Sequence, residues 1–158
     1  MWLNMKEYKL SLFADYFQFY IQDEAATGDL SDSWNDEATA RLLAIAQGVI
    51  GIGTVRNMDV PVILEVHDKK PQDDLDDWDY VVEASIEVMS GRLVIAGCTD
   101  YFPEAIRIEV LPSCYRVRVS YNGLNSISDD GLSGDDIYRI QLWSGLPTDV
   151  NILKQRLR

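Results

Sequence analysis

Residues that could carry out catalysis are few and scattered in this sequence. His67 is the single histidine, so a three-histidine metal site or a histidine pair is excluded, and it is predicted to be an ordinary residue at the end of a strand, beside Asp68 and Lys69. Cys98 and Cys114 fall on different predicted strands, as reduced thiols of a cytoplasmic protein would. Glu83 and Glu87 project from one strand face, where carboxylates are usually solvated rather than paired for acid–base catalysis. We therefore expect no catalytic residue, no cofactor and no enzymatic activity.

Carboxylates are concentrated in three segments that are predicted to be loops. Residues 22–37 and 68–79 hold six acidic residues each, and residues 129–136 hold four. Two interpretations stay open: the loops solvate a strand-rich protein, or they dock on the basic cleft of a partner. Trp78 favours docking, because tryptophan is a common anchor at protein interfaces. The residues predicted to bind the partner are Asp73, Asp74, Asp76, Asp77, Trp78, Asp129, Asp130, Asp135 and Asp136.

The third acidic segment does not match the calcium loop of an EF-hand. With Gly131 at the sixth position of that loop, the twelfth position is Ile137 instead of a glutamate. An irregular calcium site built from the four aspartates stays open beside a plain acidic turn, and we expect no metal ligand. Four arginines are predicted on outer strand faces, where they pair with carboxylates or hold an anion. They are Arg107, Arg116, Arg118 and Arg139.

The charge balance favours one class of partner over others. With 14 Lys and Arg against 26 Asp and Glu, the chain has a formal net charge of −12. Such a field repels phosphates, so we expect a basic protein as the partner and no direct nucleic-acid ligand. No apolar run reaches the roughly 18 residues of a membrane span, and residues 1–12 lack the pattern of a secretory signal. We expect a cytoplasmic protein with no membrane attachment.

Alternation of apolar and polar residues predicts about eight short strands. Short strands separated by turn signals are typical of an all-β fold, and we expect an antiparallel β-sandwich in which residues 1–158 form a single domain. The Ser90-Gly91 and Pro112-Ser113 pairs are turn signals, and each is predicted to join two adjacent antiparallel strands. Residues 92–98 are apolar on both faces, as in a central strand.

One short helix, at about residues 36–47, is predicted to interrupt the strands. Asn35 is a good N-cap, two acidic residues follow it in the first turn, and Gly48 is a C-terminal stop. Apolar residues recur between these limits at helical spacing, so one stripe of the helix can cover the sandwich. A second, weaker helix is predicted from Asp149 to the end of the chain.

The start of the predicted helix belongs to a longer motif with fixed spacing. Trp34-Asn35-Asp36-Glu37-Ala38 is followed, without a gap, by Gly48, Ile50 and Arg56-Asn57. This pattern resembles the family of competence-linked inhibitors of DNA-entry nucleases, the competence protein J family. The strands that flank the motif are also similar to the family up to about residue 70. The motif residues, including Trp34, Asn35, Asp36, Glu37, Gly48, Arg56 and Asn57, have structural explanations of their own as staple, caps and loop contacts.

The resemblance implies an all-β sandwich with a short helix, and a small protein that inhibits a nuclease by binding it. It implies no catalysis. We therefore expect a non-catalytic, immunity-like inhibitor that docks acidic loops on the basic cleft of a DNA nuclease. The alternative is a β-sandwich module that binds a carbohydrate or another small molecule, with Tyr16 and Tyr20 on one sheet face.

Overall fold

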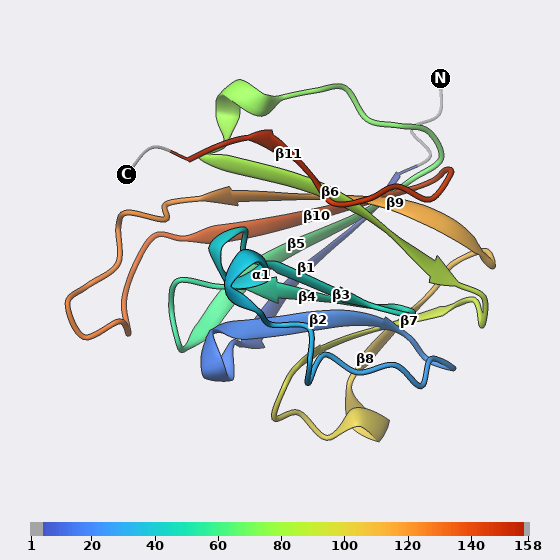
Figure 1. Cartoon of the computed structure of the whole chain (residues 1–158), viewed down its shortest axis with the longest axis horizontal. Coiled ribbons are helices and arrows are strands. Elements are labelled where there is room, and N and C mark those ends of the chain that lie inside the picture. The colour runs from blue at the N-terminus through green and yellow to red at the C-terminus, as the bar shows by residue number, and fades with distance from the viewer. Residues whose placement is uncertain (1–4, 157–158) are drawn as a thin grey trace.

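Two stacked β-sheets form the molecule, as the computed structural model of residues 5–156 shows (Figure 1). The first, sheet A, contains in spatial order β1 (Met5–Phe13), β5 (Asp59–His67), β10 (Ile137–Ser144), β9 (Ser113–Asn122), β6 (Tyr80–Val88) and β11 (Asn151–Lys154). The second, sheet B, contains in spatial order β3 (Leu43–Ala46), β4 (Val49–Gly53), β2 (Gln18–Asp23), β7 (Arg92–Gly97) and β8 (Ile106–Glu109). The prediction of an all-β sandwich is confirmed.

Helical structure is confined to the connections between strands. Among the described residues, one helix, α1 (Asp36–Ala40), lies beside β3, and three single turns of 3₁₀ helix accompany it. These turns are η1 (Asp15–Phe17), η2 (Leu75–Asp77) and η3 (Phe102–Glu104). All neighbouring strands in the described residues pair antiparallel except β5 and β10, which are parallel.

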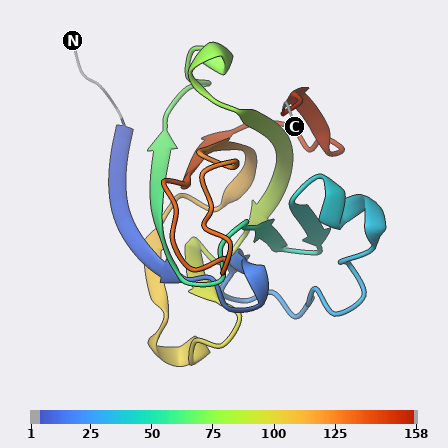
Figure 2. The same ribbon diagram turned by 90° about the vertical axis from the view of Figure 1, so that its left-hand side faces the viewer.

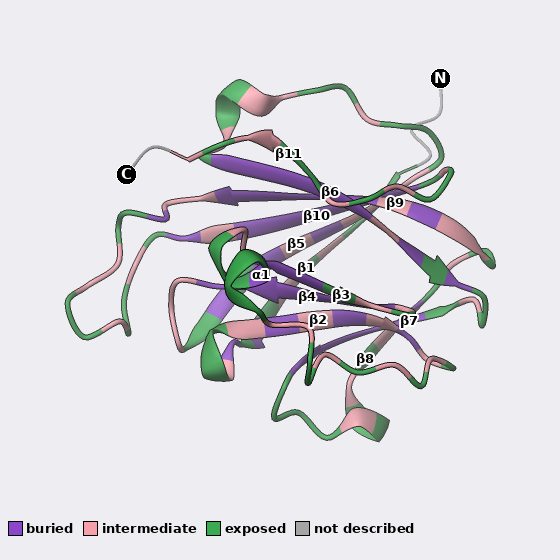
Figure 3. Cartoon of the chain, viewed as in Figure 1, coloured by how far each residue is buried: buried purple, intermediate pink, exposed green. Residues whose placement is uncertain are grey.

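The core lies between the two sheets and follows from alternation along each strand (Figure 3). From sheet A, Leu64, Val119 and Ile140 face inward, and from sheet B, Phe19 and Ile50 meet them. Buried tyrosines add hydrogen bonds at one end of this core. Their hydroxyl groups bond the backbone of other segments: Tyr80 donates to Arg41 O (2.8 Å), Tyr121 donates to Leu42 O (2.6 Å) and Tyr138 accepts from Val55 N (3.1 Å).

Helix α1 is shorter than predicted. Asn35 is the N-cap, and its Oδ1 accepts from Ala38 N at 2.8 Å. The prediction that the helix extends to residue 47 is wrong, because Leu43–Ala46 is strand β3, paired with β4. The chain leaves the helix at Leu42, whose φ of 57° is left-handed. Gly48 is therefore a residue of the β3–β4 turn, with a φ of 71°, and not a helix stop.

The predicted C-terminal helix is also wrong. Residues 151–154 form strand β11, and Ile152 lies opposite Val82 of β6. The apolar spacing that suggested a helix is explained by pairing with an open sheet edge, which local sequence does not reveal. The last two residues of that prediction, 157 and 158, lie outside the described residues.

The two predicted tight hairpins are wrong as well, because each turn passes from one sheet to the other. Strand β6 pairs with β9, and β7 pairs with β8. The register Val88↔Ser113 continues as Arg92↔Glu109, so residues 80–97 and 106–122 form one long antiparallel ribbon that bends between the sheets. Residues 98–105, with η3, are the tip of this ribbon. The prediction that residues 92–98 are central is confirmed, since β7 lies between β2 and β8.

Candidate functional site

The connection between β9 and β10, residues 123–136, projects from one end of the sandwich and is called the acidic loop (Figure 1). The side chains of Asp129, Asp130 and Asp135 are exposed on it. Ser128 Oγ donates to the Asp130 carboxylate at 2.6 Å, and this bond lowers the pKa of Asp130. The loop therefore presents fixed negative charge to solvent at neutral pH.

A buried ion pair holds the base of the acidic loop. Arg56 Nε lies 2.9 Å from Asp136 Oδ1, and the Tyr138 hydroxyl donates to Asp136 Oδ2 at 2.6 Å. Burial raises the pKa of Tyr138, so the phenol stays protonated and remains a donor. Asn57 N also donates to Gly131 O (3.3 Å). The Arg-Asn pair of the motif thus positions the acidic loop, and Asp136 is a support that does not face solvent.

The other motif residues position the segment that covers sheet B. Trp34 Nε1 donates to Gln18 Oε1 at 3.0 Å, and its ring lies over Gly51, where an added Cβ would approach it to 2.9 Å. Asp36 and Glu37 occupy the first turn of α1, where negative charge is favourable. Glu37 also faces Arg41 at 3.5 Å in a largely exposed pair. These roles are structural, as the sequence suggests for most of the motif.

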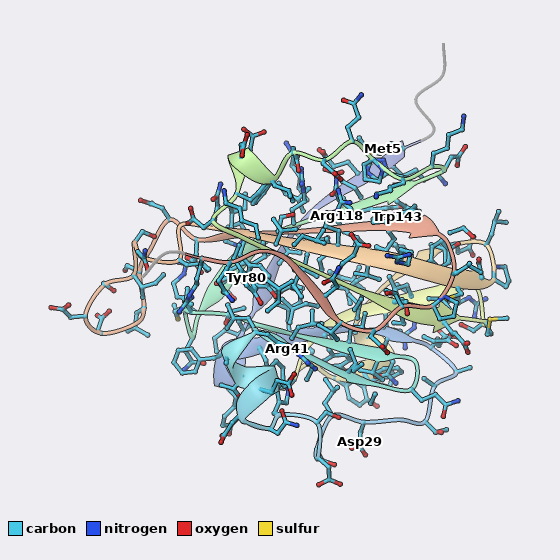
Figure 4. All side chains as sticks on the ribbon, turned by 45° about the horizontal axis from the view of Figure 1, so that its top comes forward. Met5, Asp29, Arg41, Tyr80, Arg118 and Trp143 are labelled. Atoms are coloured by element: carbon cyan, nitrogen blue, oxygen red, sulfur yellow. The ribbon has the colours of Figure 1, made fainter. Side chains whose placement is uncertain are left out.

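Residues 68–79, called the acidic strap, cross the outer face of sheet A (Figure 4). Asp73 lies 3.1 Å from the buried Arg118, and the carboxylate of Asp74 accepts two bonds of 2.7 Å from Arg139. Hydrogen bonding to Arg139 lowers the pKa of Asp74. The ring of Trp78 lies 4.4 Å from the Arg139 guanidinium. The strap is therefore held to the sheet by its own predicted site residues.

Arginines 107, 116, 118 and 139, which are predicted on outer strand faces, all pair with carboxylates. This is one of the two roles expected for them, the other being to hold an anion. Glu83 is buried and lies 2.6 Å from Arg116 and 3.3 Å from Arg118. Arg107 Nε lies 2.6 Å from Glu24, whose pKa this bond lowers. The charges of these four arginines, one on sheet B and three on sheet A, are thus balanced by carboxylates of the same chain.

The acidic strap and the acidic loop meet at their bases. Asn122 Nδ2 donates to Asp77 O at 2.8 Å, and Gly123 N donates to Asp79 Oδ2 at 2.9 Å. Asp76 and Asp77 are exposed on η2 beside this junction. Six of the predicted site residues on these two segments are carboxylates that face solvent, and one of them, Asp73, also pairs with Arg118. They are Asp73, Asp76, Asp77, Asp129, Asp130 and Asp135.

The same end of the molecule also carries an aromatic turn that sequence reasoning missed. Tyr16 and Phe17 of η1 have left-handed φ values of 58° and 60°, and their exposed fractions are 70% and 49%. Figure 2 looks onto this end and shows η1 just below the acidic loop. Thr54 N donates to Phe17 O (2.9 Å), which ties η1 to the segment that holds Arg56.

One sequence feature could have revealed the aromatic turn. Along β1 the inward residues are even-numbered, such as Leu12, whereas along β2 they are odd-numbered, such as Phe19 and Ile21. This change of parity requires a break in the strand between them, and η1 is that break. It also separates Tyr16 from Tyr20, which do not share a strand face as the small-ligand alternative supposed.

The remaining reactive groups of the described residues are apart from one another. His67 contacts Glu65 at 2.7 Å, and Cys98 and Cys114 are free thiols. Between residues 5 and 156, no three His, Cys, Asp or Glu side chains converge as metal ligands would. No helix in the same range is long and apolar enough to cross a membrane.

Comparison of folds gives the clearest relation to known proteins. Solved structures similar to this chain include ComJ. This Bacillus subtilis protein, described as an inhibitor of the DNA-degrading activity of NucA, is 20% identical, with a TM-score of 0.65 over 89% of this chain and 96% of ComJ. The product of crocagin biosynthetic gene J is 17% identical, with a TM-score of 0.58 over 92% of this chain and 100% of that one. No protein-family model and no curated protein sequence matches.

The resemblance predicted from residues 34–57 is thus confirmed at the level of the fold. At these identities the likeness concerns the fold alone. What ComJ does is a property of ComJ, and the function of this chain has to be argued from its own residues.

Proposed function

We propose that this protein is a non-catalytic inhibitor of a DNA nuclease, and that it binds the basic cleft of the enzyme through exposed carboxylates. Contact is made by Asp129, Asp130 and Asp135 of the acidic loop, together with Asp76 and Asp77 of the strap. Asp73, Asp74, Trp78 and Asp136 hold these two segments in place. The partner is a basic cytoplasmic protein that binds DNA through the same cleft.

The observation that carries this proposal is the Arg56–Asp136 pair. It joins the motif that resembles the nuclease-inhibitor family to the loop that displays the carboxylates. A cleft that binds DNA phosphates also attracts carboxylates held in a fixed arrangement, and a preorganised loop loses little entropy on binding. Figure 1 shows the loop extending well beyond the strands, as insertion into a cleft requires.

The test is inhibition of NucA, the nuclease named with ComJ, by the purified chain. DNA cleavage is followed at a fixed nuclease concentration while the chain is added at low ionic strength. We expect cleavage to fall to a low level near a one-to-one ratio and to recover at high salt, because screening weakens charge attraction. Full cleavage at a large molar excess of the chain would exclude NucA as a target and count against the proposal.

A pair of charge reversals locates the contact. Asp129→Lys with Asp130→Lys is expected to weaken inhibition about tenfold or more, mainly through slower association. The matched control is Glu87→Lys with Glu109→Lys, which makes the same change of charge at exposed positions on the opposite end of the sheets. Equal effects of the two double variants would show that only net charge matters.

A further inference from the structure

A hollow of about 380 Å³ lies between β1, the edge strand of sheet A, and β8, the edge strand of sheet B. On one side are the end of β1 and Asp59, the first residue of β5. On the other side are the ribbon tip and the start of β8, which Figure 2 shows below β1. Its lining residues include Leu12, Phe13, Asp59, Ile95, Asp100, Tyr101, Glu104 and Ile106.

Two close contacts fix the shape of this hollow. Gly97 lies against the Phe13 carbonyl, where an added Cβ would collide with the oxygen, so β7 and β1 approach closely at this point. Asp100 Oδ2 accepts from Gly97 N at 2.8 Å, which holds the ribbon tip near β1. The hollow is thus shaped by contacts within the chain that do not depend on a partner.

The lining carries negative charge and no positive charge. Asp59, Asp100 and Glu104 contribute three carboxylates, and no Lys, Arg or His is among the lining residues. Asp59 and Glu104 form no side-chain hydrogen bond or ion pair within residues 5–156. The nearby Arg107 is committed elsewhere, to Glu24 and to the carbonyl oxygens of Pro103 and Ala105.

Apolar groups complete the hollow. Leu12 and Ile95, which belong to the core, form its floor, and the residues Phe13 and Tyr101 are 40% and 68% exposed at its rim. Lysine and arginine side chains combine a long alkyl stem with a charged end, and both are attracted to aromatic rings. The volume of about 380 Å³ lies at the lower end of the roughly 300–1,000 Å³ of small-molecule sites, so one long side chain fits within the hollow.

We propose that this hollow binds a single lysine or arginine side chain that projects from a basic protein partner. The stem packs on the exposed Phe13, Tyr101 and Ile106, and the charged end lies between Asp59 and Glu104. The hollow adjoins the acidic loop, because Asp59 follows Asn57, which bonds Gly131. That the partner is a nuclease rests on the function proposed above, whereas binding of a cationic side chain does not.

The test uses peptides instead of the partner. The ¹⁵N-labelled full chain is titrated with acetyl-Gly-Arg-Gly-amide and acetyl-Gly-Lys-Gly-amide, and amide chemical shifts are recorded. We expect saturable shifts at Asp59 and residues 97–106 with at least one cationic peptide, and none with acetyl-Gly-Gln-Gly-amide. Shifts spread evenly over all acidic segments, or equal binding of the glutamine peptide, would overturn the proposal.

Matched variants separate this site from general acidity. Asp59→Asn with Glu104→Gln is expected to weaken the peptide about tenfold, because two charge-assisted contacts are lost. Glu87→Gln with Glu109→Gln removes the same charge from the opposite end of the sheets and is expected to leave peptide affinity unchanged. Similar losses in both double variants would count against a defined site.

The two proposals fail in different ways. Peptide binding at the hollow without inhibition of NucA would retain the cation site and count against the nuclease role. Inhibition of NucA without peptide binding would support the nuclease role and overturn the cation site. In that second case, Asp59→Asn with Glu104→Gln would also leave inhibition unchanged.

Discussion

Carboxylates close together in the sequence have different partners in the structure. Asp135 is exposed, while Asp136 is 1% exposed and faces Arg56 and Tyr138. In the strap, Asp76 points to solvent while Asp74 is bound by Arg139. The sequence identifies these segments as acidic but cannot assign the roles, because Arg139 lies 65 residues from Asp74 along the chain.

The neighbouring Asp135 and Asp136 allow a direct test of the buried pair. Asp136→Asn removes the counter-charge of Arg56 while keeping the shape of the side chain, and we expect a loss of about 3 kcal/mol in the free energy of unfolding. Asp135→Asn is expected to change it by less than about 0.5 kcal/mol. Urea unfolding of both variants measures the difference. Equal stabilities would mean that the ion pair does not anchor the acidic loop.

Asp74 predicts a dependence of stability on pH. Its pKa is lowered in the folded state by Arg139, so its contribution is complete above the unfolded value of about 3.9 and is lost as the pH falls through the lower folded value. We expect wild type to exceed Asp74→Asn by about 1 kcal/mol at neutral pH, after allowing for partial exposure. This difference should shrink below about pH 4 in unfolding experiments.

Asp76→Asn is the matched control for this measurement. Asp76 is exposed in the same strap and forms no ion pair within residues 5–156. We expect its variant to remain within about 0.5 kcal/mol of wild type across the same pH range. A difference between wild type and Asp74→Asn that stayed constant down to pH 2 would contradict the pairing with Arg139.

The secondary-structure elements show where sequence patterns succeed and where they stop. Alternation identifies the strands because each one has a buried face, as β5 does with Val60, Val62 and Leu64. It does not identify their partners: the turn signal Ser90-Gly91 predicts a tight hairpin, whereas in the structure it bends a long ribbon between the sheets. Likewise, the apolar residues around Ile45 recur at helical spacing, but this segment is strand β3 because it pairs with β4.

The β3–β4 turn provides a test at this level. Gly48 and Gly131 both have left-handed φ values, of 71° and 75°. A Cβ at Gly48 would lie 2.6 Å from Ala26 Cβ, whereas at Gly131 it would meet nothing within 4 Å. Gly131→Ala is therefore expected to lower the free energy of unfolding by about 1 kcal/mol, because of its backbone conformation alone. Gly48→Ala is expected to lower it by at least twice that amount. Thermal or urea unfolding that gave equal losses would contradict the close packing of this turn.

At the scale of the whole molecule, some charged side chains form ion pairs within the chain and others face solvent. Arg107, Arg116, Arg118 and Arg139 are paired within the chain on the outer sheet faces, and other carboxylates of a chain with a net charge of −12 face solvent. Several of these gather at one end with Tyr16 and Phe17. The sequence predicted the sign of this surface. It could not predict that the aromatic turn and the hollow adjoin it, because they come from segments far apart in the chain.

The most direct test of the central claim is capture of the natural partner by the whole protein. The immobilised chain and its Asp129→Lys, Asp130→Lys variant are exposed to lysate of the source cell at low salt. Each is then eluted at high salt, and the eluates are assayed for DNA cleavage. We expect a nuclease in the wild-type eluate that added wild-type chain silences, and little in the variant eluate. DNA-cleaving activity absent from the wild-type eluate, or unaffected by the added chain, would contradict the account.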